Sequence, residues 1–314
     1  MNDYSYYIYK RKRFAGMSLF TSDRTKSPLD PTPQPGSGIL FDDFNYRGAD
    51  DPALHRRQWV VRTTRGGPGL PEAYWSKSGV SFVDDPHSPG NRLLQLTAST
   101  DGAPANTQQA EICHRRKFYE GTYASRVHFT DAPVSGPTGD QIVETFFTIT
   151  PLRFDLDREY GELDFEYLPN GGWGAGGPSL YLTTWETYRK EPWLADNIHT
   201  KLDGSFAGWH TCLIQVAAGN VRYYIDGALQ AEHGGKYYPE TPMSLNYNLW
   251  FIQDGLLQSA APRVYVQHVD WIYYSGAEVL TSEQVEARIA DYRRSKIKHI
   301  DTVPVWETLE RTPS

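Results

Sequence analysis

The chain has 314 residues, of which 39% are hydrophobic, and its formal net charge at pH 7 is -7. This length accommodates one large all-β domain with a sizeable core. The acidic balance argues against a nucleic acid or an anionic membrane as partner, because both require a basic surface. No apolar run approaches the length of a membrane span, so the composition favours a neutral partner.

Residues 1–38 form a first segment whose composition changes twice. Asp3 to Phe14 is rich in Tyr and then basic, and Ser27 to Gly38 carries four prolines. This proline spacing is typical of an extended linker or a wrapping arm. The segment has no continuous apolar core of the kind that a secretory signal requires. We therefore expect a processed chain or another route of export, and a cytoplasmic location stays open.

Strand patterns dominate residues 39–276, which we predict to be one domain. In Arg92 to Ala98, for example, Leu94 and Leu96 share one face of an extended chain, and turn formers such as Asp84-Asp85-Pro86 separate neighbouring strands. Short strands at this regular spacing are typical of a β-sandwich or a barrel.

Three carboxylates occupy alternate positions between Tyr160 and Pro169. In an extended strand Glu162, Asp164 and Glu166 point to one face, whereas the apolar residues between them point to the other. The commonest reason for such alternation is a solvated strand face, but here no Lys or Arg separates the acids. Crowded like charges raise the pKa of a carboxyl group, as a general acid near neutral pH requires. We interpret this face as a candidate catalytic site.

The strand predicted at Ile142 to Thr150 comes just before the acidic strand. Because consecutive strands usually pair, one of Phe146 and Phe147 should face the carboxylates, and we select Phe147. After the acidic strand, residues 170–178 form a glycine-rich loop with a single large aromatic residue, Trp173.

The final segment, residues 277–314, is predicted as a helix followed by a tail. Thr281 and Gln284 have the spacing of a capping box, and Val285, Ile289 and Tyr292 form an apolar stripe. We expect this single helix, over residues 281–295, to pack on the outside of the sandwich, and residues 297–314 to form the tail.

The segment Gly161 to Leu168, GELDFEYL, resembles the signature of glycoside hydrolase family 16 in its E-x-D-x-E form. The later strands are similar to those of the family in order and spacing, and the resemblance runs from about Phe41 to Tyr274. It implies a concanavalin A-like β-jelly roll, that is, two antiparallel sheets with a concave substrate cleft. It also implies that Glu162 is the nucleophile, that Glu166 is the acid/base and that Asp164 assists them.

The same resemblance implies that the protein is an extracellular retaining endo-β-glycosidase that hydrolyses a polysaccharide. A β-1,3- or mixed-linkage β-1,3-1,4-glucan is the default substrate. A transglycosylase stays open as an alternative, because it differs only in whether a sugar or water resolves the intermediate. A non-catalytic carbohydrate-binding or wall-associated module also stays open, since a fold does not guarantee activity. We expect a monomer that needs no cofactor for catalysis.

A polysaccharide cleft needs aromatic side chains near the acids, because sugar rings stack on them. The substrate-binding candidates are Phe147, Trp173, Trp185 and Trp250, and for each Trp a core position is the alternative. The family often binds a structural calcium ion on its convex side, and Asp270 matches the ligating Asp. Oxygen ligands suit calcium, but a surface Asp without a metal is the alternative.

Overall fold

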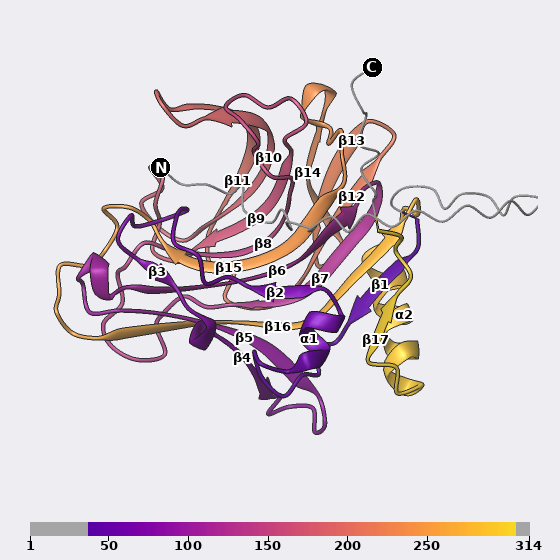
Figure 1. Cartoon of the computed structure of the whole chain (residues 1–314), viewed down its shortest axis with the longest axis horizontal. Helices are drawn as coiled ribbons and strands as arrows, with labels where there is room; N and C mark the ends of the chain where they lie inside the picture. The colour runs from indigo at the N-terminus through magenta and orange to yellow at the C-terminus, as the bar shows by residue number, and fades with distance from the viewer. Residues whose placement is uncertain (1–36, 306–314) are drawn as a thin grey trace, which may run out of the picture.

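The computed structural model describes residues 37–305. Strands dominate it and form two packed, mainly antiparallel sheets (Figure 1), which confirms the predicted β-sandwich. Almost all of the predicted N-terminal segment, 1–38, lies outside the described residues.

One sheet carries the three acidic residues on one of its inner strands, β9 (Glu162–Leu168). From one edge to the other it contains β11 (Leu194–Asp203), β10 (Ser179–Arg189), β9 (Glu162–Leu168), β8 (Ile142–Ile149), β15 (Met243–Phe251), β6 (Gln108–Phe118) and β2 (Trp59–Val61). Every neighbouring pair in it is antiparallel. We call this the β9 sheet.

The other sheet, which we call the β7 sheet, packs against the first. In order it contains β4 (Val80–Asp84), β5 (Arg92–Thr100), β16 (Arg263–Gly276), β7 (Gly121–Phe129), β12 (Gly208–Ala217), β13 (Asn220–Ile225) and β14 (Ala228–Gly234). Beyond the end of β5, β16 pairs with β1 (Ile39–Asp42), which in turn pairs with β17 (His299–Asp301). The sheets are joined at β6, which meets β5 and pairs in parallel with β3 (Tyr74–Trp75).

The alternation in β9 positions the acids. Leu163, Phe165 and Tyr167 are fully buried between the sheets, and the ring of Phe165 stacks on that of Phe146 at 6.0 Å between centroids. Burying each such side chain stabilises the fold by about 1.5–3 kcal/mol. A one-residue slip of β9 would place carboxylates in the core, so this packing fixes the face on which the acids lie.

The predicted helix is α2 (Ser282–Arg294), and its capping box is present. Val285 and Ile289 are buried against Phe41 and Trp271 on the outer face of the β7 sheet, as expected. One short helix was not predicted, α1 (Pro52–Arg56), which Asp51 caps. Single turns of 3-10 helix lie at Lys77–Gly79, Pro104–Asn106 and Gly235–Tyr237.

The prediction of a tail from residue 297 is wrong for β17. This strand pairs with β1, and both carboxylate oxygens of Asp301 accept hydrogen bonds from Nζ of the buried Lys117, each at 2.7 Å. The ion pair joins the end of the described chain to β6, and therefore to the sandwich.

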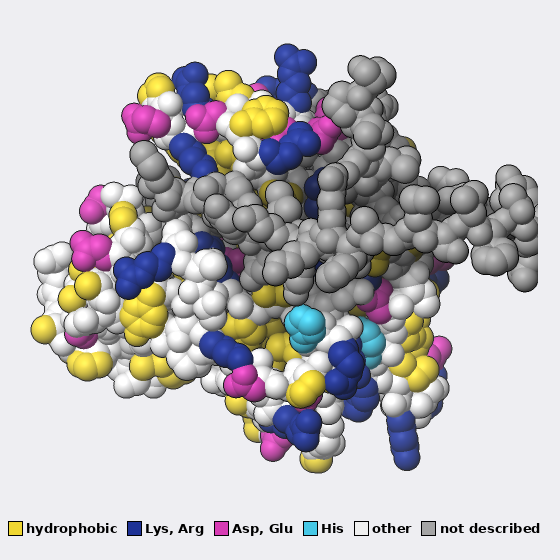
Figure 2. All heavy atoms as spheres, in the orientation of Figure 1, with side chains coloured by type: hydrophobic (Ala, Val, Ile, Leu, Met, Phe, Trp, Pro, Cys, Tyr) yellow, Lys and Arg dark blue, Asp and Glu magenta, His cyan; other side chains and the backbone are white. Residues whose placement is uncertain are grey.

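The surface of the described part of the chain carries both signs of charge. On the face drawn in Figure 2, Lys and Arg side chains are interspersed with Asp and Glu. Among residues 37–305, no helix is both long enough and apolar enough to cross a membrane.

Candidate active site

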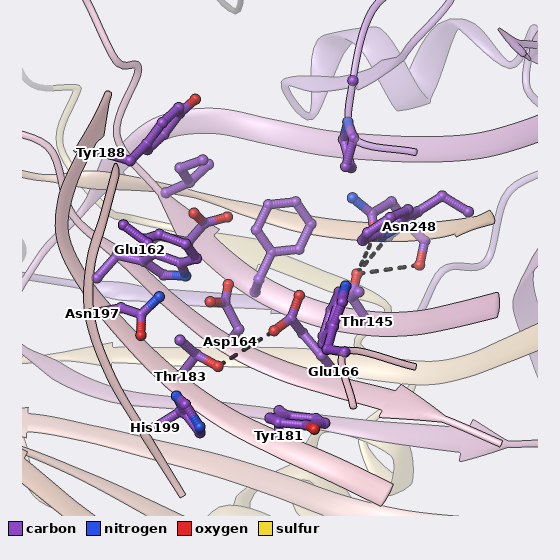
Figure 3. A pocket seen from close by; sticks show the side chains of 18 of the residues that line it. Thr145, Glu162, Asp164, Glu166, Tyr181, Thr183, Tyr188, Asn197, His199 and Asn248 are labelled. Carbon is purple, nitrogen blue, oxygen red and sulfur yellow. Dashed lines mark hydrogen bonds between the residues drawn. The ribbon is translucent and has the colours of Figure 1, made fainter. Parts of the chain in front are cut away.

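A cleft of about 1260 Å³ lies over the face of the β9 sheet that points away from the core. Its floor is built from alternate residues of adjacent strands (Figure 3). The floor residues are Thr145 and Phe147 on β8, Glu162, Asp164 and Glu166 on β9, Tyr181, Thr183 and Trp185 on β10, Asn197 and His199 on β11, and Asn248 and Trp250 on β15.

Strand register places the three carboxylates in one row along this floor. Glu162 lies opposite Trp185 of β10, and Glu166 lies opposite Tyr181. On the other side, Phe147 of β8 lies opposite Asp164. Because β9 is paired along both edges, the backbone beneath the acids is held by hydrogen bonds on each side.

Burial raises the pKa of every carboxyl group in the row. The pKa of Glu162 rises to about 7. Burial together with the charge of Glu162 raises the pKa of Glu166 to about 8. The pKa of Asp164 rises well above its usual range, through burial and then through the charges of both glutamates. The higher pKa of Glu166 means that it holds its proton more firmly than Glu162 does.

A buried hydroxyl distinguishes the two glutamates. Tyr160 donates a hydrogen bond to Oε2 of Glu162, which opposes the effect of burial on the pKa of Glu162. Glu166 accepts only a long bond from Thr183, at 3.4 Å. The Oδ2 atom of Asp164 is buried and has no hydrogen-bond partner among the described residues. Of the two glutamates, Glu162 is the one whose carboxylate form is better stabilised.

All four predicted aromatic residues line the cleft, but they differ in exposure. Trp173 is 46% exposed, whereas Trp250 is 8% and Phe147 is 6% exposed. The Trp173 ring lies 6.0 Å from that of Trp250 and 5.4 Å from that of Tyr181, measured between centroids. Trp185 lies beside the opposite end of the acid row, across from Glu162. Aromatic rings therefore flank both ends of the row.

Comparison with solved structures identifies the fold. Bacillus licheniformis β-glucanase is similar at a TM-score of 0.54 and 16% identity, over 76% of this chain and 98% of that one. A glycoside hydrolase family 16 endo-glucanase from Bacteroides ovatus is similar at a TM-score of 0.55 and 15% identity, over 74% of this chain and 98% of that one. A laminarinase from Flavobacterium sp. UMI-01 is similar at a TM-score of 0.52 and 13% identity, over 75% of this chain and 98% of that one.

This chain has the fold of glycoside hydrolase family 16. No protein-family model and no curated protein matches the sequence significantly, so the likeness is carried by structure. The row of acids on β9 lies on the floor of the cleft described above.

The surroundings of Asp270, the predicted calcium ligand, do not fit a calcium ion. Arg293 of α2 donates to both carboxylate oxygens, at 2.6 and 3.0 Å, and Asn91 donates at 2.7 Å. A guanidinium group thus occupies the position that a cation would need. Within residues 37–305, no group of three or more His, Cys, Asp or Glu side chains is arranged to hold a metal ion.

Sequence reasoning missed several cleft residues. Thr145 and Thr183 could have been found from the period-two pattern once their strands had been paired with β9. Asn197 and His199 could not, because β11 has few apolar residues and was not predicted as a strand. Trp193, at the turn between β10 and β11, lies between Pro192 and Leu194 with no pattern to mark it.

Proposed function

We propose that this protein is a retaining endo-β-glycosidase that hydrolyses a polysaccharide, a β-1,3- or mixed-linkage β-1,3-1,4-glucan. The observation that carries the proposal is the row of buried acids with raised pKa values on the floor of the cleft. The similar solved structures bear names such as β-glucanase and laminarinase, which supports this substrate class. Because a polysaccharide is too large to cross a membrane unaided, the chain acts outside the cell.

In the first step Glu162 is the nucleophile and Glu166 is the general acid. Glu166 gives its proton to the glycosidic oxygen while the carboxylate of Glu162 bonds to the anomeric carbon and the carbon–oxygen bond breaks. Two observations support these roles: Tyr160 donates a hydrogen bond that stabilises the anion of Glu162, and Glu166 has the higher pKa. The leaving chain departs with a free hydroxyl, and a glycosyl ester remains on Glu162.

In the second step Glu166, now ionised, removes a proton from water. The water oxygen bonds to the anomeric carbon, and the ester to Glu162 breaks. The α carbons of residues four apart on a strand are about 13 Å apart, so the glutamate side chains must lean towards each other over Asp164. Burial and the two neighbouring glutamates raise the pKa of Asp164, which disfavours a third negative charge between them. Its Oδ2 atom has no hydrogen-bond partner among the described residues, and in this mechanism it hydrogen-bonds the nucleophile or the sugar.

The test is the release of reducing ends from a panel of soluble β-glucans, galactans and xyloglucan, with wild type beside Glu162→Gln. We expect release from a β-glucan by wild type and none by the variant. Binding of glucan by wild type without any release would favour a binding module. Products longer than the starting chains would favour a transglycosylase.

A further inference from the structure

A cluster of aromatic rings runs from the Glu162 end of the acid row, along β10, to the turn between β10 and β11. The centroid of the Trp193 ring lies 5.6 Å from that of Tyr188 and 6.4 Å from that of Trp185. All three residues line the cleft. Trp193 is 64% exposed, so much of its ring surface is open to a ligand in the cleft. We call these three residues the hairpin platform.

The hairpin platform is held in place from below and from the side. The ring of Tyr188 packs edge-on against Tyr160, at 5.3 Å between centroids, and Tyr160 bonds Glu162. The backbone carbonyl of Tyr188 accepts a hydrogen bond from Leu156 at 2.9 Å, and the backbone N–H of Lys190 bonds the side chain of Asp155 at 3.3 Å. A surface that is already ordered loses less conformational freedom when a ligand binds.

The charge beside the platform favours a neutral ligand. Lys190 and Glu191 are adjacent in the chain, and both line the cleft. In the same turn Arg189 donates to the carbonyl of Pro192, and the carboxylate of Asp155 accepts from the N–H of Lys190. Two positive charges thus stand beside two negative ones, so no excess of positive charge is available here for a sulfate or uronate group. The C–H face of a neutral pyranose ring instead suits the exposed face of an aromatic side chain.

We propose that the hairpin platform is a sugar-binding subsite beyond the acid row, in which Trp193 stacks on a pyranose ring of a neutral β-glucan that lies further along the chain than the sugar at the cleaved bond. The inference rests on the proposed function, because it takes the acid row as the cleavage point. Its consequence is a preference for chain length. Long chains reach both the acids and Trp193, whereas short chains reach only the acids.

The test compares Trp193→Ala with wild type on a series of glucan oligosaccharides of increasing length. We expect kcat/KM to fall roughly tenfold on long chains, as for the loss of one aromatic contact, and to stay unchanged on the shortest chains that are cut. The matched control is Phe154→Ala, since Phe154 is 60% exposed and does not line the cleft. Equal losses on short and long chains, or no loss, would overturn the proposal.

Binding separates this inference from the proposed function. Calorimetry in the Glu162→Gln background measures the affinity for a long glucan oligosaccharide with Trp193 present or replaced by Ala. If wild type cleaves glucan but the Glu162→Gln proteins with and without Trp193 bind it equally, the proposed subsite at Trp193 is refuted and the proposed function stands. If wild type cleaves nothing but the Trp193 replacement still weakens binding about tenfold, the platform stands and the proposed function fails.

Discussion

The hydrogen bond from Tyr160 to Glu162 sets the protonation of the proposed nucleophile. Tyr160→Phe keeps the ring that packs on Tyr188 and removes only the hydroxyl. A hydrogen bond to a charged group contributes about 1.5–3 kcal/mol, and one pKa unit corresponds to about 1.4 kcal/mol. The pKa of Glu162, about 7 in the wild type, should therefore rise by roughly one to two units.

The proposed mechanism requires Glu162 to be ionised and Glu166 to be protonated at the same time. Since the pKa of Glu166 is about 8, the Tyr160→Phe change should lower the productive fraction at pH 7 by roughly 5- to 50-fold. The assay is kcat/KM on glucan against pH, and the acidic limb should move to higher pH. Tyr224→Phe is the control, because it removes a hydroxyl that bonds Gln215 far from the acids. An acidic limb that stays in place would refute this reasoning.

Further predictions concern stability and chemistry elsewhere in the molecule. Burial raises the pKa of Glu166 from 4.5 to about 8, so the folded state binds more protons than the unfolded state, and stability falls as pH rises through this range. Urea unfolding measures how far the free energy of unfolding drops between pH 5 and pH 8, and this drop should be smaller by about 1–4 kcal/mol in Glu166→Gln than in wild type. An equal drop in both proteins would contradict this prediction. Azide should partly restore cleavage by Glu166→Gln only for a glycoside with an activated leaving group, and rescue without activation would argue against the acid role. Because Arg293 pairs with Asp270, a chelator should leave the melting temperature unchanged, whereas Arg293→Ala should lower the free energy of unfolding by about 1–3 kcal/mol. Asp301→Ala leaves the buried Lys117 without its carboxylate partner and should cost about 3 kcal/mol; a loss below about 1 kcal/mol would show that β17 is held by other contacts.

The acidic strand could be predicted residue by residue, because its alternation has only one consistent arrangement. Once Leu163 and Phe165 are in the core, period two places all three acids on the opposite face. The cleft side of β8 followed from the pairing of consecutive strands, since Phe147 lies opposite Asp164. Helix α2 followed from local signals alone, namely a capping box and an apolar stripe.

What could not be predicted depends on contacts between residues far apart in sequence. Strand β17 has only three residues, and its ion pair with Lys117 joins positions 184 residues apart. The expected calcium ligand, Asp270, is paired with Arg293 of α2, a contact that strand patterns do not contain. Strand β11 is an edge strand with mostly polar side chains, so neither period two nor an apolar run marks it.

The most direct test of the central claim is to identify the residue that carries the sugar during the reaction. A β-glucan oligosaccharide with a 2-fluoro group and an activated leaving group slows the second step, so that the glycosyl ester accumulates. Mass spectrometry of the digested protein should then find the added sugar on the peptide that contains Glu162, and Tyr160→Phe should form the ester more slowly at pH 7. Labelling of a different residue, or turnover of the reagent with no covalent adduct, would contradict the account.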